Sequence, residues 1–285
     1  MRYLIVSDIH GNLPALEAVL ATPEARACDA VISLGDHVGF GPQPREVHLR
    51  LEELHALMLL GNHEERLHHP ADFVGYNWNM LHWTLRQLEG LNSDFPVDGR
   101  LGPVWLTHGM PGNPFSLIHK ATYERDLLPI LDALPEDVTH LLSGHNHIQW
   151  WIEHHGRTAF NPGSVGIPED GEGGVAPFAV MELEGERVTL TRCQVPYDLR
   201  EMARAFITSG AVEAAPEMCR SVYQTMRTGE YQGVTKLMRH ISWLSREHGF
   251  EFGDQEAWEA ADRTWTWLEP LSTAEFWKRA EEALL

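Results

Sequence analysis

The chain has few of the residues that stabilise secreted or membrane-spanning proteins. Its three cysteines, Cys28, Cys193 and Cys219, are an odd number and lie far apart in the sequence. They provide neither a disulfide framework nor a cysteine-rich zinc site, and they favour a reducing compartment. The apolar run after Met1 is shorter than a signal peptide needs, and none of the apolar runs approaches the ~20 residues of a membrane span. We therefore expect a cytoplasmic protein with no membrane partner.

Positive charge is also scarce. Lys and Arg number 22 against 41 for Asp and Glu, which makes the formal net charge −19 at pH 7. This excess of negative charge repels a phosphate backbone, so a nucleic-acid polymer is not expected as a partner. A small anionic substrate is not excluded, because bound metal ions can reverse the local field.

The rest of the composition is that of a globular protein, with 43% hydrophobic and 22% charged residues. Apolar runs of strand length alternate with helical patterns of apolar residues at a spacing of three and four. The strand-length runs are residues 3–6, 30–34, 56–60, 104–106 and 138–142, and the helical patterns cover residues 13–20 and 127–134. This alternation predicts an α/β fold, in which ligands gather outside the carboxyl ends of the strands.

The pattern changes in the second half of the chain. Residues 178–183 and 187–195 predict two more strands joined by a hairpin turn at Gly185. From residue 198 onward the strand signals end and tryptophan-rich helical stretches follow. We therefore predict a main domain over residues 1–197 and a helical appendage over residues 198–285 that packs on it.

One helical face of the predicted appendage contains Ala257, Ala261, Trp265 and Leu268. Such a face favours packing against the main domain. The alternative is that the appendage covers the functional site or forms a homo-oligomer, because aromatic patches also mark pockets and partners.

Five short polar motifs follow the predicted strands of the main domain. They are Asp8-Ile9-His10, Gly35-Asp36-His37-Val38-Gly39, Gly61-Asn62-His63-Glu64, Thr107-His108-Gly109 and Gly144-His145-Asn146-His147. Residues two apart in an extended chain point the same way, so each D-x-H or H-x-H pair can hold one cation. Mixed oxygen and nitrogen ligands suit manganese, iron, zinc, cobalt or nickel better than calcium. The number of candidate ligands fits two ions better than one.

These motifs resemble those of the calcineurin-like metallophosphoesterases. The order D-x-H, G-D-x-x, G-N-H-D/E, a lone His and G-H-x-H is complete over residues 3–165. The resemblance implies an αββα sandwich with two metal sites that share Asp36 as a bridging ligand. The implied ligands are Asp8, His10, Asp36 and His147 for one ion, and Asp36, Asn62, His108 and His145 for the other. The resemblance makes His63 the catalytic histidine, which is not a ligand and is placed to donate a proton or a hydrogen bond near the leaving group.

The implied activity is the hydrolysis of small phosphate esters by two divalent transition-metal ions, with manganese as the expected metal. Metal-activated water attacks phosphorus in line, so no nucleophilic Ser or Cys is needed. The expected substrate is small, phosphorylated and nucleotide-like. The run Asn161-Pro162-Gly163-Ser164 is similar to the turn that follows G-H-x-H in the small prokaryotic members.

One departure from the family bears on the substrate. Protein phosphatases of this superfamily carry Asp and Arg where this chain has Gly39 and Phe40, so an arginine that grips phosphate is missing there. We therefore expect phosphodiesters or dinucleoside polyphosphates to be preferred. The alternatives are a phosphomonoesterase or protein phosphatase, in which Arg45 or Lys120 replaces that grip, and a non-catalytic interaction module. The intact set of motif residues argues against the module.

Other polar residues have simpler interpretations. His37 is predicted to be a neighbour of the site and not a ligand, and Asn161 and Ser164 are expected to form a turn. The remaining polar clusters are expected to be solvated; they are His68-His69, His154-His155 and the acidic loop with Glu169, Asp170 and Glu172.

Overall fold

The computed structural model describes residues 1–118, 122–251 and 253–284 of the chain. These residues form two five-stranded sheets with the strand orders β10-β9-β1-β2-β3 and β4-β5-β6-β8-β7. The strands of the first sheet are β1 Arg2–Val6, β2 Ala30–Ser33, β3 Leu57–Met58, β9 Val175–Glu184 and β10 Arg187–Pro196. Those of the second are β4 Asp98–Leu101, β5 Val104–Thr107, β6 His140–Leu142, β7 Gln149–His154 and β8 Arg157–Pro162.

The two sheets pack face to face. Successive side chains of a strand point to opposite faces, so Ile5 of β1 lies in the core between the sheets together with Leu142 of β6. Its neighbours Leu4 and Val6 point to the other side, toward the helices. Both faces of β1 are therefore buried, which explains why this strand is apolar throughout.

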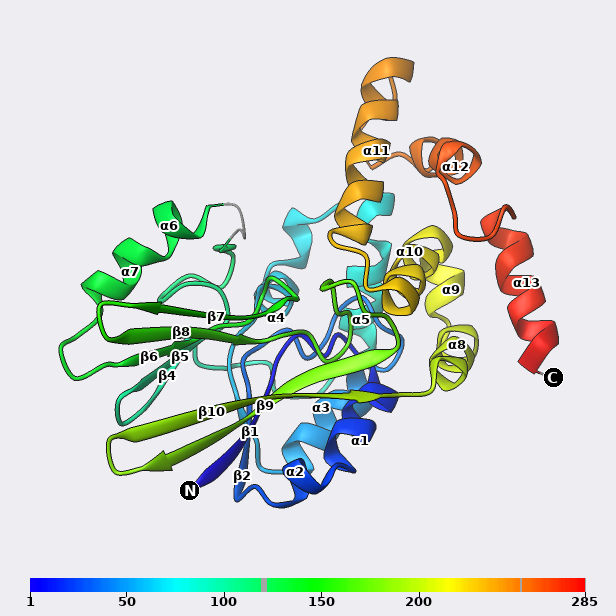
Figure 1. Ribbon diagram of the computed structural model, residues 1–285. Helices are drawn as coiled ribbons and strands as arrows, with labels where there is room; N and C mark the ends of the chain where they lie inside the picture. Colours follow the sequence, from blue (N-terminus) through cyan, green and yellow to red (C-terminus); the bar gives the residue numbers. More distant parts are fainter. Residues whose placement is uncertain (119–121, 252, 285) are drawn as a thin grey trace.

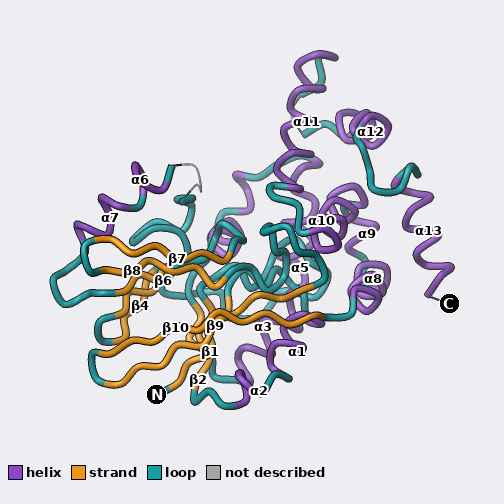
Figure 2. The backbone as a smooth tube through the Cα atoms, viewed as in Figure 1, coloured by secondary structure: helices purple, strands orange, loops and turns teal. Residues whose placement is uncertain are grey.

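Helices cover the outer face of each sheet. On the first sheet, α1 (Leu13–Leu20) and α3 (Pro44–Glu53) share an apolar core with the outer side of β1. On the second, α7 (Leu128–Ala133) packs against β6 and β8. The predicted αββα sandwich is thus confirmed, and Figures 1 and 2 show its layers. The other helices of this part are α2 Pro23–Arg26, α4 Asn62–His68, α5 Asn79–Gln87 and α6 Tyr123–Asp126, with 3-10 turns at Pro70–Asp72 (η1) and Tyr76–Trp78 (η2).

The predicted strands all fall on observed strands, whereas β4, β7 and β8 were not predicted from the sequence. The predicted turn that starts at Asn161 begins two residues later, because Asn161 and Pro162 still pair with β7. Gly163 then turns the chain with a φ of 84°. Its left-handed conformation is the reason for glycine there.

Residues from Leu199 onward form helices with a core of their own. These helices are α8 Leu199–Thr208, α9 Ala211–Ala214, α10 Pro216–Thr228, α11 Gly233–His248, α12 Gln255–Thr264 and α13 Thr273–Leu284. Their core includes Met80 and Trp83 of α5, so the helices pack on the rest of the protein (Figure 1). The division of the chain after residue 197 stays a prediction. Within the described ranges, none of the helices is both long and apolar enough to cross a membrane.

The predicted apolar face of this segment is only half correct. Ala257 and Ala261 are buried in α12, but the helix ends at Thr264, and Leu268 is 52% exposed. The reason is that Trp265 has an extended backbone, with φ −74° and ψ 142°, so the helical spacing does not continue to Leu268.

Candidate metal centre

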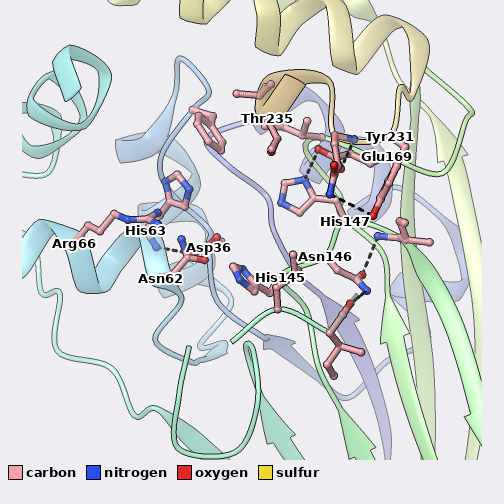
Figure 3. A pocket seen from close by; sticks show the side chains of 17 residues that line it. Asp36, Asn62, His63, Arg66, His145, Asn146, His147, Glu169, Tyr231 and Thr235 are labelled. Atoms are coloured by element: carbon pink, nitrogen blue, oxygen red, sulfur yellow. Dashed lines mark hydrogen bonds and ion pairs between the residues drawn. The ribbon is translucent and has the colours of Figure 1, made fainter. Parts of the chain in front are cut away.

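Eight polar side chains that were selected from the sequence lie at one edge of the two sheets. They are Asp8 and His10 after β1, Asp36 after β2, Asn62 and His63 after β3, His108 after β5, and His145 and His147 after β6. The strands β1, β2 and β3 are parallel to one another, as are β5 and β6, so their carboxyl ends meet at this edge. Figure 3 shows Asp36, His145 and His147 around a common space.

Asp8, His10 and His147 form a first group of potential ligands. One ligand atom from each residue lies within 4.8 Å of the others. His147 Nε2 is 3.3 Å from Asp8 Oδ1 and 3.0 Å from His10 Nε2. The three side chains are therefore close enough to coordinate a single cation.

Asp36, His108 and His145 form a second group of the same size. Asp36 Oδ2 lies 3.3 Å from His108 Nε2 and 3.8 Å from His10 Nε2 of the first group. Asp36 is thus the carboxylate between the two groups, in the position that a bridging ligand requires.

Asn62 joins the second group through its side-chain oxygen. This atom lies 3.1 Å from Asp36 Oδ2, 2.8 Å from His145 Nδ1 and 3.1 Å from His108 Nε2. Turning the amide would let its NH₂ group donate to these atoms and its oxygen accept from Arg66; in the present orientation the oxygen faces the carboxylate and the two imidazole nitrogens. A cation among them would give the carboxylate, the amide oxygen and both nitrogens a common partner, so the residues fit a bound metal.

Hydrogen bonds to the backbone orient two of the imidazoles toward the centre. His10 Nδ1 lies 3.2 Å from Val38 O, and His108 Nδ1 lies 2.8 Å from Leu34 O. A proton on Nδ1 makes both bonds and leaves the Nε2 lone pair directed at the carboxylates. Metal-binding histidines are commonly held by this kind of second contact.

The buried carboxylates require positive charge beside them. Burial raises the pKa of Asp8 and Asp36, but the neighbouring imidazoles lower that of Asp8 to about 2 and that of Asp36 well below its usual range. Burial alone would lower the pKa of the imidazoles. The carboxylate of Asp8 nevertheless raises the pKa of His147 to about 9, and that of Asp36 raises the pKa of His108 to about 9. Protons on these imidazoles thus neutralise the charge of the carboxylates. Bound metal ions can take over this role, and the protons are then released.

Five of the seven candidate ligands have a left-handed backbone. Their φ values lie between 48° and 70°, and the residues are Asp8, His10, Asp36, His145 and His147. A side chain in this region costs on the order of 1–3 kcal/mol, and such residues gather at functional sites where the surrounding structure holds them. The conformation lets each chain turn sharply after its strand and direct its side chain back toward the centre.

His63 lies on the edge of this cluster. Its backbone N–H donates to Asp36 Oδ1 at 2.8 Å, and its ring packs edge-on against Phe40 with centroids 4.5 Å apart. A ligand atom of His63 also lies within 4.8 Å of those of His10 and Asp36. Burial lowers the pKa of His63 well below its usual value.

The contact with His63 explains why the residues at positions 39 and 40 differ from those expected in the protein phosphatases. Gly39 has a φ of 98°, and a Cβ atom there would lie 2.3 Å from His63 Nδ1. No aspartate fits at this position without displacing the histidine. Phe40 therefore holds the ring of His63 by packing, where the protein phosphatases are expected to use a carboxylate.

Glu64 is a site residue to which the sequence interpretation assigned no function. It is buried, and its carboxylate accepts the backbone N–H groups of Asp36 and Gly61 at 2.9 Å and of Val38 at 3.1 Å. These bonds connect the Asp36 loop to the first turn of α4. Its place three residues after Gly61 matches the capping-box spacing, which was the available sequence signal.

Arg66 is a second site residue that was missed. It lines the cavity at the metal centre together with His63, three residues earlier on α4. Helical spacing therefore could have found it. Arg45, a predicted substitute for the missing arginine, donates instead to Gln87 O and Glu89 O, and Lys120 lies outside the described residues.

The prediction that the acidic loop is solvated is wrong for one of its three residues. The side chain of Glu169 is 13% exposed, and its Oε1 lies 3.9 Å from His147 Nδ1. It accepts the backbone N–H of Gln232 at 2.8 Å, so the segment between α10 and α11 buries it. Asp170 and Glu172 are exposed as expected.

The C-terminal helices cover the metal centre. The cavity there has a volume of roughly 240 Å³, and Tyr231, Gln232, Val234 and Thr235 form one of its walls. Figure 3 shows Tyr231 and Thr235 close to His147. This lining agrees with the alternative prediction that the C-terminal segment covers the site.

The other histidines that were considered from the sequence and that the structure describes lie outside the cluster. His37 is buried and faces Glu64, with 3.3 Å between Nδ1 and Oε1, so it is a neighbour as predicted. His68, His69 and His155 are exposed as expected, whereas His154 is partly buried. Asn161, expected only to form a turn, donates to Gly144 O and so supports the loop of His145.

The match to a protein family agrees with this geometry. The calcineurin-like phosphoesterase superfamily domain matches residues 1–186. A metallophosphoesterase from Sphaerobacter thermophilus is 30% identical and superposes with a TM-score of 0.63 over 80% of this chain and 100% of that protein. Phosphodiesterase YfcE of Escherichia coli K12 is 28% identical over 171 residues, which are 60% of this chain and 83% of YfcE. An uncharacterized protein of Methanocaldococcus jannaschii is 26% identical over 222 residues, 69% of this chain and 88% of that protein.

Proposed function

This chain belongs to the calcineurin-like phosphoesterase superfamily and is a metal-dependent phosphoesterase, and we propose that it hydrolyses small phosphodiesters at the metal centre. The observation that carries the proposal is the pair of ligand groups that share Asp36. Two divalent ions, when bound, activate water and neutralise the charge of the phosphate. We propose manganese as the physiological metal.

We assign the ligands by their groups. Asp8, His10 and His147 would hold one ion, Asn62, His108 and His145 would hold the other, and Asp36 would serve both groups. The Nδ1 contacts of His10 and His108 keep the rings in place before an ion arrives.

We propose that His63 donates a proton or a hydrogen bond to the departing oxygen. It lies beside Asp36, and packing against Phe40 sets the plane of its ring. A positioned acid contributes roughly 10²–10⁴-fold to the rate, most for a leaving group that is a poor alkoxide. Phosphodiesters usually have such leaving groups.

The scarcity of cationic side chains around the site favours diesters over monoesters. Arg66 is the single Arg or Lys among the described residues that line the cavity, and the position of the phosphatase arginine is occupied by Phe40. A monoester dianion depends more on cationic contacts than a diester monoanion does. The relative YfcE is described as a phosphodiesterase, which agrees with this preference. The three free cysteines, Cys28, Cys193 and Cys219, fit our proposal that the protein works in the cytoplasm.

The test compares bis(p-nitrophenyl) phosphate with p-nitrophenyl phosphate. Metal-stripped protein receives manganese, iron, zinc, cobalt or nickel in separate reactions, and kcat/KM is measured for both esters. We expect the highest value for the diester with manganese. A clear preference for the monoester would refute the diester proposal, and no turnover with any ion would favour the interaction module.

A further inference from the structure

A second cavity lies beside the cavity at the metal centre, on the far side of His63. We call it the side chamber; its volume is roughly 230 Å³. It shares a wall with the cavity at the metal centre, and that wall consists of Phe40, His63, Arg66, Val234 and Thr235. Beyond the wall its lining is apolar and includes Trp78, Met80, Leu81, Met218 and Met238. The two cavities are therefore adjacent, with His63 between them.

Two polar atoms of the chamber lining have no partner. Asn77 is 6% exposed and Thr84 is 1% exposed, and both line the chamber. Within the described part of the chain, neither Asn77 Nδ2 nor Thr84 Oγ1 makes a hydrogen bond. Asn77 Oδ1 accepts the indole N–H of Trp258 at 2.5 Å, which fixes the amide with its NH₂ group unpaired.

An unpaired buried polar group is costly and rare. Leaving such a donor unsatisfied costs about 1–3 kcal/mol, and buried groups of this kind call for a specific reason. A ligand in the chamber that carries a hydrogen-bond acceptor would remove the cost. Apolar walls with one or two placed polar groups are the usual construction of a site for a small ring system.

We propose that the side chamber is the leaving-group subsite and binds a heteroaromatic ring of nucleobase type. The inference rests on the proposed diesterase function. The phosphate lies at the metal centre and the ring lies among Phe40, Trp78 and the methionines. Asn77 Nδ2 donates to an acceptor on the edge of the ring. A volume of roughly 230 Å³ suits one ring system and excludes a whole dinucleotide.

This placement determines which bond breaks. The oxygen of water forms a bond to phosphorus while the bond from phosphorus to the nucleoside oxygen breaks. His63, on the wall between the cavities, directs its ring N–H to that departing oxygen, and the departing oxygen takes up the proton lost by water. The products are the free nucleoside, released on the chamber side, and a phosphomonoester on the metal side.

The chamber depends on the C-terminal helices. Met218 belongs to α10, while Val234, Thr235 and Met238 belong to α11. The family match ends at residue 186, before these helices begin. The C-terminal helices therefore complete a chamber whose other lining residues lie within the family-matched part of the chain.

The first experiment identifies the products from adenosine 5′-(methyl phosphate) with the manganese-loaded enzyme. We expect adenosine and methyl phosphate on chromatography. The abasic analogue, ribose 5-(methyl phosphate), lacks the ring, so its kcat/KM should be lower by about tenfold or more. Release of adenosine monophosphate and methanol, or equal rates for the two esters, would overturn the subsite.

The second experiment removes the donor. Asn77→Asp keeps an oxygen for Trp258 and loses the NH₂ group, so kcat/KM for the adenosine ester relative to the abasic ester should fall by on the order of tenfold. Asn79→Asp is the matched control, because Asn79 lies two residues away and does not line the chamber. An unchanged ratio in Asn77→Asp would contradict the assigned contact.

A third variant covers the possibility that Asn77→Asp does not fold, which thermal unfolding reports. Met238→Lys changes a partly buried residue of α11 that lines the chamber, and Trp243→Lys changes an exposed residue of the same helix outside it. The adenosine preference should fall in the first and persist in the second. If the wild type cleaves bis(p-nitrophenyl) phosphate but shows no adenosine preference, the subsite is wrong and the diesterase function stands. If it cleaves no diester with any ion, the proposed function itself fails.

Discussion

Glu64→Gln tests how the loops of the metal centre are held in place. The carboxylate of Glu64 accepts three backbone N–H groups, from Asp36, Val38 and Gly61. Glutamine has one acceptor oxygen in place of two. If this oxygen keeps the two bonds to Asp36 and Gly61, the new NH₂ group faces the N–H of Val38, and one bond is lost.

The expected magnitude follows from that single bond. A hydrogen bond to a charged group contributes roughly 1.5–3 kcal/mol, which corresponds to roughly 10- to 150-fold in an equilibrium constant. Because Glu64 connects the Asp36 loop to the helix turn of Asn62, the loss should appear as weaker metal binding. We expect the affinity for manganese to fall by a factor in that range.

The metal-free protein should respond differently. Burial and the charge of Asp36 raise the pKa of Glu64 from its ordinary 4.5 to about 8. The folded metal-free protein then binds this proton more tightly than the unfolded chain, so its stability falls as pH rises between those two values. Glu64→Gln has no such proton and should lack this part of the pH dependence. At pH 6 it should unfold at nearly the wild-type temperature.

Two measurements decide the matter. Competition with a chelating dye gives the manganese affinity, and thermal unfolding with and without manganese gives the stability. Glu65→Gln is the matched control, since Glu65 faces His68 with Oε2 3.7 Å from Nδ1 and does not contact the Asp36 loop. Equal manganese affinity in the two variants would refute the reasoning, as would equal destabilisation of the metal-free and loaded Glu64→Gln protein.

The remaining predictions concern the metals and the proton donor. Elemental analysis of the loaded protein should find close to two transition-metal equivalents per chain, and Asp36→Asn should reduce this number because Asp36 lies between both ligand groups. One tightly held ion that Asp36→Asn leaves unchanged would exclude a shared ligand. His63→Asn should keep both metals and lose roughly 10²–10⁴-fold in kcat, most for poor leaving groups. Loss of metal in this variant would make His63 a ligand.

Much of the centre could be predicted from the sequence because its ligands follow strands. An apolar run that ends in Asp8 and His10 places both side chains at a sheet edge, and the same logic holds for His145 and His147. Arg66 was within reach of the same reasoning through its helical spacing from His63. The strands around the centre were predicted because they are continuous apolar runs.

The rest depends on contacts between distant segments. The side chamber needs Met238 of α11 beside Trp78 of η2, and Glu169 is buried only because Gln232 lies over it. Neither pair has a periodic sequence signal. The unpredicted strand β7 has partly buried and exposed positions in alternation, with Trp151 41% exposed, so its aromatic residues do not mark a core.

The position of β1 has a consequence for how the chain folds. This strand pairs with β2, which is close in sequence, and with β9, where Arg2 is opposite Glu182. Strand β1 is therefore paired on both sides only after residue 182 has been synthesised, and closing so long a loop slows folding. Until then β1 is an unprotected edge with two apolar faces, which can pair with other chains. Newly synthesised chains should consequently need protection from aggregation during this interval.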